Sequence, residues 1–415
     1  MSAEQYTRRT VLRFAAATGG AIAISGAAGA PWASAAASPS SKRVYVLVID
    51  GCRPDEITPE QTPNLHALRT AGRWYPNARS MPIAETIPNH TMMMTGVRPD
   101  RGGVPANEVY DRALGEVRTV GEPEDITFPT VLERLRERGL TTGTVLSKDY
   151  LFSVFGERAT YRWEPFPLLP VTNHALDAFT MSALRRMVAS ADPHLVFANF
   201  GDIDRFGHSD LTGSSLQVLR RTALTSTDQQ IGSFVRWLRT RPAWPNTTVI
   251  VLADHSMDWS WARKAVSLTK AFAGDPLLDG TVAIADNGGA DLLTYTGPAS
   301  RRTAALARAR TLALATTGVL SVHTPAELRL GSKAGDLIVF CKSGYRFSDP
   351  DPVSNPIPGN HGHPATYPIP FFLTGGAVAP AVRSERAATI DVAPTVGRIL
   401  GLPAPRGGYD GTPRI

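Results

Sequence analysis

Acidic and histidine residues recur in four separate segments of this 415-residue sequence, at spacings that suit metal binding. The candidate ligands are Asp50 in VYVLVID, Asp204 and His208 in DIDRFGHSD, Asp254 and His255 in VLADHSM, and His361 in GNHGH. Carboxylates and imidazoles are the side chains that divalent metal ions such as zinc prefer. A single strand-end aspartate more often caps the next helix, so the indication rests on the whole set.

A threonine stands out in the segment IAETIPNHTMMMTG, residues 83–96. The six residues from Asn89 contain no helix breaker, Pro88 is tolerated in a first helical turn, and Gly96 suits a helix end. Thr86 is therefore predicted at a helix N-terminus, where free amides and the helix dipole attract an anion such as phosphate. The three methionines at 92–94 are predicted to pack in the core behind it.

Apolar runs alternate with helical patterns, and three of the runs end in the acidic residues above. The predicted strands cover residues 44–50, 141–146, 194–200 and 247–254, and the predicted helices cover residues 62–72, 128–139 and 215–238. This alternation predicts an α/β fold with a doubly wound, mostly parallel central sheet and helices on both faces. The active crevice of such a sheet lies outside the carboxyl ends of its strands, so the acidic residues should meet there.

The rest of the sequence is expected to belong to the same catalytic domain, residues 36–415. Residues 256–359 are less regular and predict a smaller inserted α+β region that extends or covers the main sheet. Residues 388–405 predict a turn, an amphipathic helix and a glycine stop.

The first 35 residues have the composition of an export signal. Twin arginines, Arg8 and Arg9, precede a mildly apolar stretch of small residues, and an Ala-x-Ala pattern ends at Ala35. We expect a twin-arginine signal peptide over residues 1–35, a secreted product and no stable membrane span after cleavage, with a retained anchor as the alternative. Cys52 and Cys341 could form a disulfide or stay free. The net charge of +6 has no Lys/Arg block, which argues against a nucleic-acid-binding module, and the oligomeric state is not predicted.

The sequence resembles the alkaline phosphatase superfamily, and within it the nucleotide pyrophosphatase/phosphodiesterase branch. The matching segments, in the family's order, are VLVIDGCRPD, TPNLHALRTAG, ETIPNHTMMMTGVRPDRGGV, DIDRFGHSD, VLADHSM, GNHGH and DVAPTVGRILGL. They span nearly the whole chain after the export signal. The resemblance implies an alkaline phosphatase-like fold that carries two divalent metal ions, with zinc expected and manganese or iron as alternatives.

The resemblance also implies a role for each candidate residue. One zinc would be held by Asp204, His208 and His361, and the other by Asp50, Asp254, His255 and the hydroxyl of Thr86. Thr86 would be the nucleophile that forms a phosphothreonine, and Asn89 would donate its amide to a phosphate oxygen. Asn107 and Lys148 are candidate substrate contacts. The residues expected to stay outside the metal shell are His90, Asp202 and His363.

The resemblance implies a two-metal phosphodiesterase or pyrophosphatase that hydrolyses small-molecule phosphate esters. A phosphomonoesterase would need an added cation, for which the candidates are Arg53, Arg98, Lys148 and Arg205. A phosphonate hydrolase is a further alternative, because Lys148 in SKDYL resembles a lysine-containing segment of phosphonoacetate hydrolases. A sulfatase is disfavoured, since TIPNH lacks the Cys/Ser-x-Pro-x-Arg pattern of that group. A non-catalytic binding protein on the same fold is the alternative of a different class.

Overall fold

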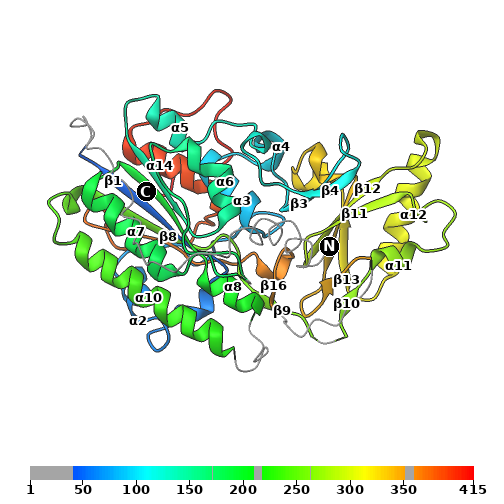
Figure 1. The fold of residues 1–415 in the computed structure, drawn as a ribbon, viewed down its shortest axis with the longest axis horizontal. Helices are drawn as coiled ribbons and strands as arrows, with labels where there is room; N and C mark the ends of the chain where they lie inside the picture. Colours follow the sequence, from blue (N-terminus) through cyan, green and yellow to red (C-terminus); the bar gives the residue numbers. More distant parts are fainter. Residues whose placement is uncertain (1–40, 171, 210–216, 262, 351–358) are drawn as a thin grey trace, which may run out of the picture.

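The computed structural model describes residues 41–415 except 171, 210–216, 262 and 351–358 (Figure 1). The predicted signal peptide therefore lies outside the described residues. Among the residues that are described, no helix is long and apolar enough to cross a membrane. Cys52 and Cys341 are both buried and both free, so these two thiols do not form a disulfide in the structure.

A central sheet of eight strands forms the larger part of the molecule, in the order β18-β2-β17-β8-β1-β7-β5-β6. The strands are β1 (Arg43–Ile49), β2 (Arg73–Trp74), β5 (Thr142–Leu146), β6 (Tyr161–Trp163), β7 (Leu195–Phe200), β8 (Thr247–Leu252), β17 (Phe371–Thr374) and β18 (Ala381–Val382). β1 lies between β7 and β8 and is parallel to both, whereas β17 is antiparallel to β8. β7 and β8 are buried along their whole length, and so is β1 after its first residue, because helices cover both faces of the sheet.

Two groups of helices flank this sheet (Figure 1). One group contains α2 (Pro63–Thr70), α7 (Asp177–Ser190) and α10 (Val218–Leu238), and the other contains α3 (Thr86–Thr95), α5 (Val131–Arg136) and α14 (Val392–Leu400). The predicted fold class, a doubly wound and mostly parallel α/β sheet, is confirmed. Helix ends differ from the prediction by a few residues, and the start predicted at residue 215 lies outside the described residues.

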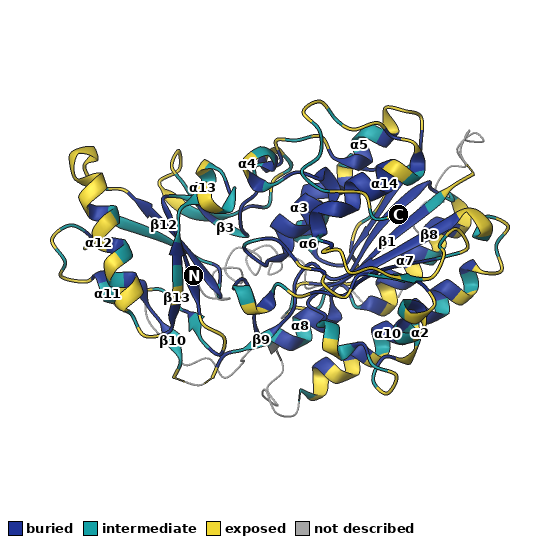
Figure 2. Cartoon of the chain, turned by 180° about the vertical axis from the view of Figure 1, so that it is seen from behind, coloured by how far each residue is buried: buried dark blue, intermediate teal, exposed yellow. Residues whose placement is uncertain are grey.

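The smaller region has a sheet of its own, so the expectation that it extends or covers the main sheet is wrong. Its four strands are antiparallel, in the order β11 (Val282–Asp286), β12 (Ala290–Tyr295), β14 (Leu337–Cys341) and β13 (Val319–His323). They pack with α11 (Leu268–Phe272) and α12 (Arg302–Ala315) around a separate apolar core. Figure 2 shows this second lobe, with the outer face of α12 exposed and the strands of the main sheet buried.

Candidate metal centre and active site

The predicted ligands lie at the carboxyl ends of three neighbouring strands. Asp50 follows β1, and Asp254 with His255 follows β8. The turn after β7 leads into α8 (Asp202–Ser209), which carries Asp204 and His208. Because β1 is paired with both β7 and β8, these three chain segments emerge side by side at one edge of the sheet.

The histidine at position 361 reaches the same edge from the C-terminal part of the chain. It follows β16 (Gly359–Asn360), a short strand that pairs with β9 (Asp258–Trp259) just beyond β8. Two groups of residues have potential ligand atoms that all lie within 4.8 Å of one another. One group is Asp50, Asp254 and His255, and the other is Asp204, His255 and His361, so His255 belongs to both. His208 Nε2 lies 3.3 Å from Asp204 Oδ1, and Thr86 Oγ1 lies 3.4 Å from His255 Nε2. The structure thus brings together all seven residues that the sequence pointed to.

The three histidines all present the same ring nitrogen to the centre of the cluster. The Nδ1 atoms of His208, His255 and His361 lie 3.0, 2.9 and 3.0 Å from backbone carbonyl oxygens, those of Gly359, Ser256 and Ala84. A carbonyl oxygen only accepts, so each Nδ1 carries a proton, and in the neutral form of each ring the lone pair is on Nε2. This is the arrangement that orients a histidine for metal ligation.

The three aspartates each leave one buried oxygen without a hydrogen-bond partner. These atoms are Asp50 Oδ1, Asp204 Oδ1 and Asp254 Oδ2. The opposite oxygens are satisfied: Asp50 Oδ2 accepts from Asn199, Asp204 Oδ2 from Lys148, and Asp254 Oδ1 from two backbone amides. A buried, unpartnered carboxylate oxygen is costly, and a cation between such oxygens and the Nε2 atoms removes that cost. The donor set of oxygen and imidazole nitrogen fits two divalent ions such as zinc.

Protonation of the cluster is shifted by burial and by crowding of like charges. Burial, together with Asp254, raises the pKa of Asp50 to about 7. Burial opposes the ionisation of Asp204 as well, but Lys148 and His208 outweigh it and hold its pKa well below the usual range. Burial and the neighbouring His255 and His208 lower the pKa of His361 well below its usual value, which keeps its ring neutral. A neutral imidazole beside ionised carboxylates is the state that metal binding requires.

Lys148 lies inside this cluster rather than in solvent. Its side chain is fully buried, and Nζ is 2.8 Å from both Asp50 Oδ2 and Asp204 Oδ2 and 3.3 Å from Thr86 Oγ1. It comes from the turn after β5, as the residue before α6 (Asp149–Phe155). Burial disfavours its charged form, but Asp204 and Asp50 outweigh that effect and raise the pKa of Lys148, so it is a cation. Lys148 therefore contacts one carboxylate from each metal-ligand group and the threonine.

Thr86 is the first residue of α3, the position predicted from the sequence. The helix is buried throughout and ends at Gly96, whose φ of 72° is the left-handed conformation of a glycine cap. Thr86 Oγ1 accepts a hydrogen bond from Lys148, and it lies near His255 Nε2. The hydroxyl oxygen thus stands at a helix N-terminus, beside both ligand groups.

The predicted role of Asn89 is not supported by its contacts. Both N–H bonds of its amide are used within the protein, with Ile83 O at 3.2 Å and Glu85 O at 3.0 Å. Its Oδ1 atom accepts from Met81 N and from Thr389 Oγ1. We therefore correct the prediction: Asn89 holds the loop before α3 in place and has no N–H to offer a phosphate.

Asn107 has the free amide that Asn89 lacks. Its Oδ1 atom accepts the N–H of Ile87 at 3.0 Å, which places the side chain against the first turn of α3. In the part of the chain that the structure describes, no hydrogen bond of its Nδ2 group is found. The Nδ2 group of Asn107 is therefore available as an N–H donor on a side chain that is bonded to the first turn of α3.

Asn199 is a residue of this site that the sequence reading missed. Its Nδ2 group donates to Asp50 Oδ2 at 2.8 Å and to His90 Nε2 at 3.1 Å. Since that nitrogen of His90 accepts, its Nδ1 carries the proton and donates to Thr86 O at 2.8 Å. Asn199 and His90 thus link a candidate metal ligand to the backbone of the candidate nucleophile. The sequence feature that could have indicated Asn199 is that it is the one polar residue in the otherwise apolar strand LVFANF.

Among the described residues, the remaining candidates belong to neither of the two ligand groups. Asp202 accepts from His174 Nε2 at 2.8 Å, and His363 Nε2 pairs with Asp258 at 2.8 Å, while the buried Nδ1 atom of His363 has no hydrogen-bond partner among the described residues. Arg98 follows the far end of α3, beyond Gly96, and its backbone N–H bonds Asp410. This places Arg98 away from Thr86.

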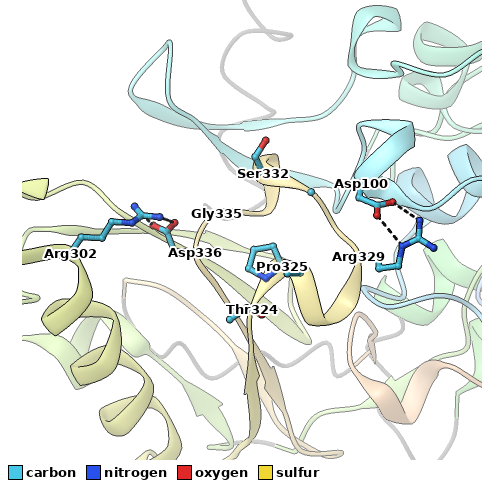
Figure 3. Close-up of a pocket in the computed structure, with 10 residues that line it drawn as sticks. Asp100, Arg302, Thr324, Pro325, Arg329, Ser332, Gly335 and Asp336 are labelled. Atoms are coloured by element: carbon cyan, nitrogen blue, oxygen red, sulfur yellow. Dashed lines mark hydrogen bonds and ion pairs between the residues drawn. The ribbon is translucent and has the colours of Figure 1, made fainter.

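A separate cavity of about 540 Å³ lies between α4 (Pro99–Gly102) and the smaller lobe (Figure 3). Its charged groups are already paired, Arg329 with Asp100 at 2.9 Å and Arg302 with Asp336. None of the seven candidate ligands lines it. The chemistry indicated by the side chains therefore belongs to the cluster at the sheet edge and not to this cavity.

Comparison with known proteins gives a family and a fold. Residues 44–363 match the family described as "Type I phosphodiesterase / nucleotide pyrophosphatase". The chain is 22% identical over 227 residues to bis(5'-adenosyl)-triphosphatase enpp4 of Xenopus laevis, covering 52% of this chain and 48% of that protein. It is 21% identical over 227 residues to human ectonucleotide pyrophosphatase/phosphodiesterase family member 5, covering 53% and 46%. The chain thus spans about half the length of the curated relatives it matches.

Solved structures share the fold over most of the chain. Murine ectonucleotide pyrophosphatase/phosphodiesterase 5, an inactive variant in complex with AMP, superimposes with a TM-score of 0.73 at 16% identity, covering 89% of this chain and 97% of that chain. Phosphonoacetate hydrolase from Sinorhizobium meliloti, in complex with phosphonoformate, superimposes with a TM-score of 0.69 at 16% identity, covering 87% and 96%. At these identities the likeness establishes the fold.

Proposed function

Because the chain belongs to the type I phosphodiesterase/nucleotide pyrophosphatase family, we propose that it is a metal-dependent hydrolase that cleaves phosphate diester or pyrophosphate bonds of small molecules. One observation carries the proposal. Three unpartnered carboxylate oxygens, the oriented Nε2 atoms of the histidines and the hydroxyl of Thr86 converge at the sheet edge. This donor set suits a pair of divalent ions beside a nucleophile.

The ligand assignment is the one that the family resemblance implies; the two groups and the contact of Thr86 with His255 support it for six of the residues, and His208 joins it through its 3.3 Å approach to Asp204. Asp204, His208 and His361 would hold one ion, and Asp50, Asp254, His255 and Thr86 Oγ1 would hold the other. Zinc is the expected ion, with manganese or iron as alternatives. When bound, the ions would lower the pKa of the threonine hydroxyl and offset negative charge on the phosphoryl and leaving oxygens.

Three residues of the chain are assigned roles in the reaction. Thr86 Oγ1 gives its proton to solvent and attacks phosphorus, so that an Oγ–P bond forms while the bond from phosphorus to the leaving alcohol or phosphate breaks, and the leaving oxygen takes up a proton from water. Water hydrolyses the resulting phosphothreonine and restores the hydroxyl. Lys148 Nζ keeps a hydrogen bond on Oγ1, and the free amide of Asn107 donates to a phosphoryl oxygen.

Lys148 also favours a second candidate function, hydrolysis of a phosphonate. A fully buried cation that touches both ligand groups suits a substrate with extra negative charge, such as a phosphonate that also bears a carboxylate. Phosphonoacetate hydrolase, which has this fold, acts on such a compound. The other candidate cations have contacts outside the ligand groups: Arg53 pairs with Asp55, and Arg205 lies over the ring of Tyr150.

Export and domain organisation form part of the same proposal. Residues 1–35 would direct secretion through the twin-arginine pathway, and residues 36–415 would form the catalytic domain with the inserted region at about 256–359. N-terminal sequencing of the protein recovered from the culture medium tests this. A mature chain that begins near residue 36 supports it, and an uncleaved chain in the membrane fraction contradicts it.

Activity is tested on purified protein whose bound metal has been quantified. The substrates are bis(nitrophenyl) phosphate, nitrophenyl phosphate, phosphonoacetate and nitrophenyl sulfate. Thr86→Ala should lose at least about a thousandfold in kcat on the best substrate, whereas Thr95→Ala, a buried threonine in the same helix, should keep most of it. A Thr86→Ala variant with wild-type turnover excludes the nucleophile assignment. Faster hydrolysis of the monoester or of phosphonoacetate than of the diester replaces the diesterase assignment with the corresponding alternative.

A further inference from the structure

A turn of the smaller lobe contacts the active-site region of the larger one. It joins β11 to β12 and consists of Asn287, Gly288 and Gly289. Hydrogen bonds within the hairpin shape it, from Asn287 N to Ala290 O and from Gly288 N to Asp286 Oδ1, both 2.8 Å long. Asn287 is 5% exposed, so its amide faces the protein and not solvent.

The first contact runs through Asn287 to the N-terminal turn of α3. Its Oδ1 atom accepts the N–H of Glu108 at 2.8 Å, and its Nδ2 group donates to the carbonyl of Glu108 at 3.1 Å. These two bonds hold both backbone polar groups of the residue that follows Asn107. Asn107 in turn accepts from Ile87 N and donates its own N–H to Glu85 Oε2, on either side of Thr86.

The second contact runs through Gly289 to the loop that carries His361. A Cβ atom on Gly289 would lie 2.3 Å from His361 O, 2.4 Å from His363 Nδ1 and 2.7 Å from His363 N. From the opposite side, a Cβ on Gly362 would lie 2.8 Å from Asn287 O. Two backbones therefore lie in direct contact here, and glycine is required because no side chain fits between them.

We propose that the Asn287–Gly289 turn is a positioning element of the active site, which sets the His361 imidazole through Gly289 and the Asn107 amide through Asn287. The proposal rests on the proposed function of that site. No residue of the turn reaches the reacting atoms; each acts through the neighbour it holds. The smaller lobe has its own apolar core, and Ala285 and Ala290 beside the turn also pack in the main core, so the turn adds polar and close backbone contacts where the two lobes already meet.

Two variants with different expected effects test the proposal. Gly289→Ala should displace His361 and weaken zinc binding at one of the two sites by about 10- to 100-fold, the range found when a partner that orients a ligand is lost. Asn287→Ala leaves the Gly289 contact in place, so it should keep zinc affinity and lower kcat, with KM little changed. Zinc affinity and stoichiometry are measured by competition with a chromophoric chelator, and kcat and KM on the best phosphorus substrate.

Gly297→Ala is the matched control. The added Cβ atom would lie 2.4–3.0 Å from side-chain atoms of Tyr295, just past the other end of β12. The substitution therefore introduces a steric clash in the smaller lobe without changing the turn. The proposal is overturned if the two turn variants change only the unfolding midpoint, as this control does. If Gly289→Ala does not fold, the kcat of Asn287→Ala decides: an unchanged kcat overturns the proposal, and a lowered one supports it. If the wild type binds two zinc ions but hydrolyses no phosphorus substrate, the proposed function fails, while the zinc affinity of Gly289→Ala still decides the role of the turn.

Discussion

The Lys148 side chain is expected to have two roles: it balances charge in the metal centre, and it donates a hydrogen bond to Thr86. Replacing Lys148 with methionine allows the two roles to be measured separately. Methionine keeps the length and the apolar stem but removes the ammonium group. In the structure, Nζ lies 2.8 Å from one oxygen each of Asp50 and Asp204, all of them buried. The substitution therefore leaves two carboxylates without the cation that holds them together.

The expected cost depends on whether metal is bound. Removing one partner of a buried ion pair costs about 3–5 kcal/mol. Protonation of Asp50, whose pKa is about 7, limits the loss, so we expect about 3 kcal/mol at pH 7.5 without metal. With two divalent ions present the carboxylates have new counterions, and the loss should fall to about 1 kcal/mol, the value of ordinary hydrogen bonds.

The difference of about 2 kcal/mol is a coupling free energy between Lys148 and the metal ions. It means that Lys148→Met should bind zinc about 30-fold more tightly than the wild type, because a positive charge that repels the ions has gone. Turnover should nevertheless fall, by about 100-fold, since Oγ1 of Thr86 loses its hydrogen-bond donor. Tighter metal binding together with slower chemistry is the signature of this assignment.

Urea unfolding at pH 7.5, in EDTA and in excess zinc, gives the two stability losses, and chelator competition gives the zinc affinity. Lys333→Met is the control, because that lysine pairs with Asp125 at 3.2 Å and is more than a third exposed. It should change neither zinc affinity nor turnover. Equal destabilisation of Lys148→Met with and without zinc, or weaker zinc binding, would refute the charge-balance reasoning.

Three further substitutions probe neighbouring parts of the structure. Asn199→Ala removes the donor to Asp50 Oδ2 and should weaken zinc binding about 10- to 100-fold in chelator competition; unchanged affinity would contradict its positioning role. Burial lowers the pKa of His174 to about 4, so the stability that its neutral ring supplies is complete above about pH 6.5 and is lost as the pH falls toward 4. The destabilisation caused by His174→Gln should accordingly shrink by about 2 kcal/mol between pH 7 and pH 4.5 in urea unfolding, and a constant difference would argue against a neutral ring. Asp228 accepts from Asn64 N and Leu65 N at the start of α2; Asp228→Ala should cost about 2–3 kcal/mol and leave zinc affinity unchanged, and altered zinc binding would show that α2 is coupled to the site.

The architecture was predictable because its evidence is local in the sequence. Apolar runs such as 44–50 and 247–254 are long enough to mark buried strands, and helical patterns between them require parallel pairing. Parallel strands bring their carboxyl ends to one edge, which is why the sequence alone predicts that Asp50 and Asp254 lie together. The smaller lobe was harder, because its short antiparallel strands pair with one another and not with the main sheet.

The amino-acid sequence by itself determined the strand-end carboxylates, the histidines near them and the threonine at a helix start, since each follows from residue type and local pattern. Tertiary structure alone decided which asparagine has a free amide, where Lys148 lies, and that Asn199 and the Asn287–Gly289 turn support the site. The physical reason is that hydrogen-bond occupancy and burial depend on partners distant in the chain. Asn89 loses one N–H to Ile83 and its oxygen to Thr389, 300 residues away, whereas Lys148 becomes buried because Asp50 and Asp204 fold onto it.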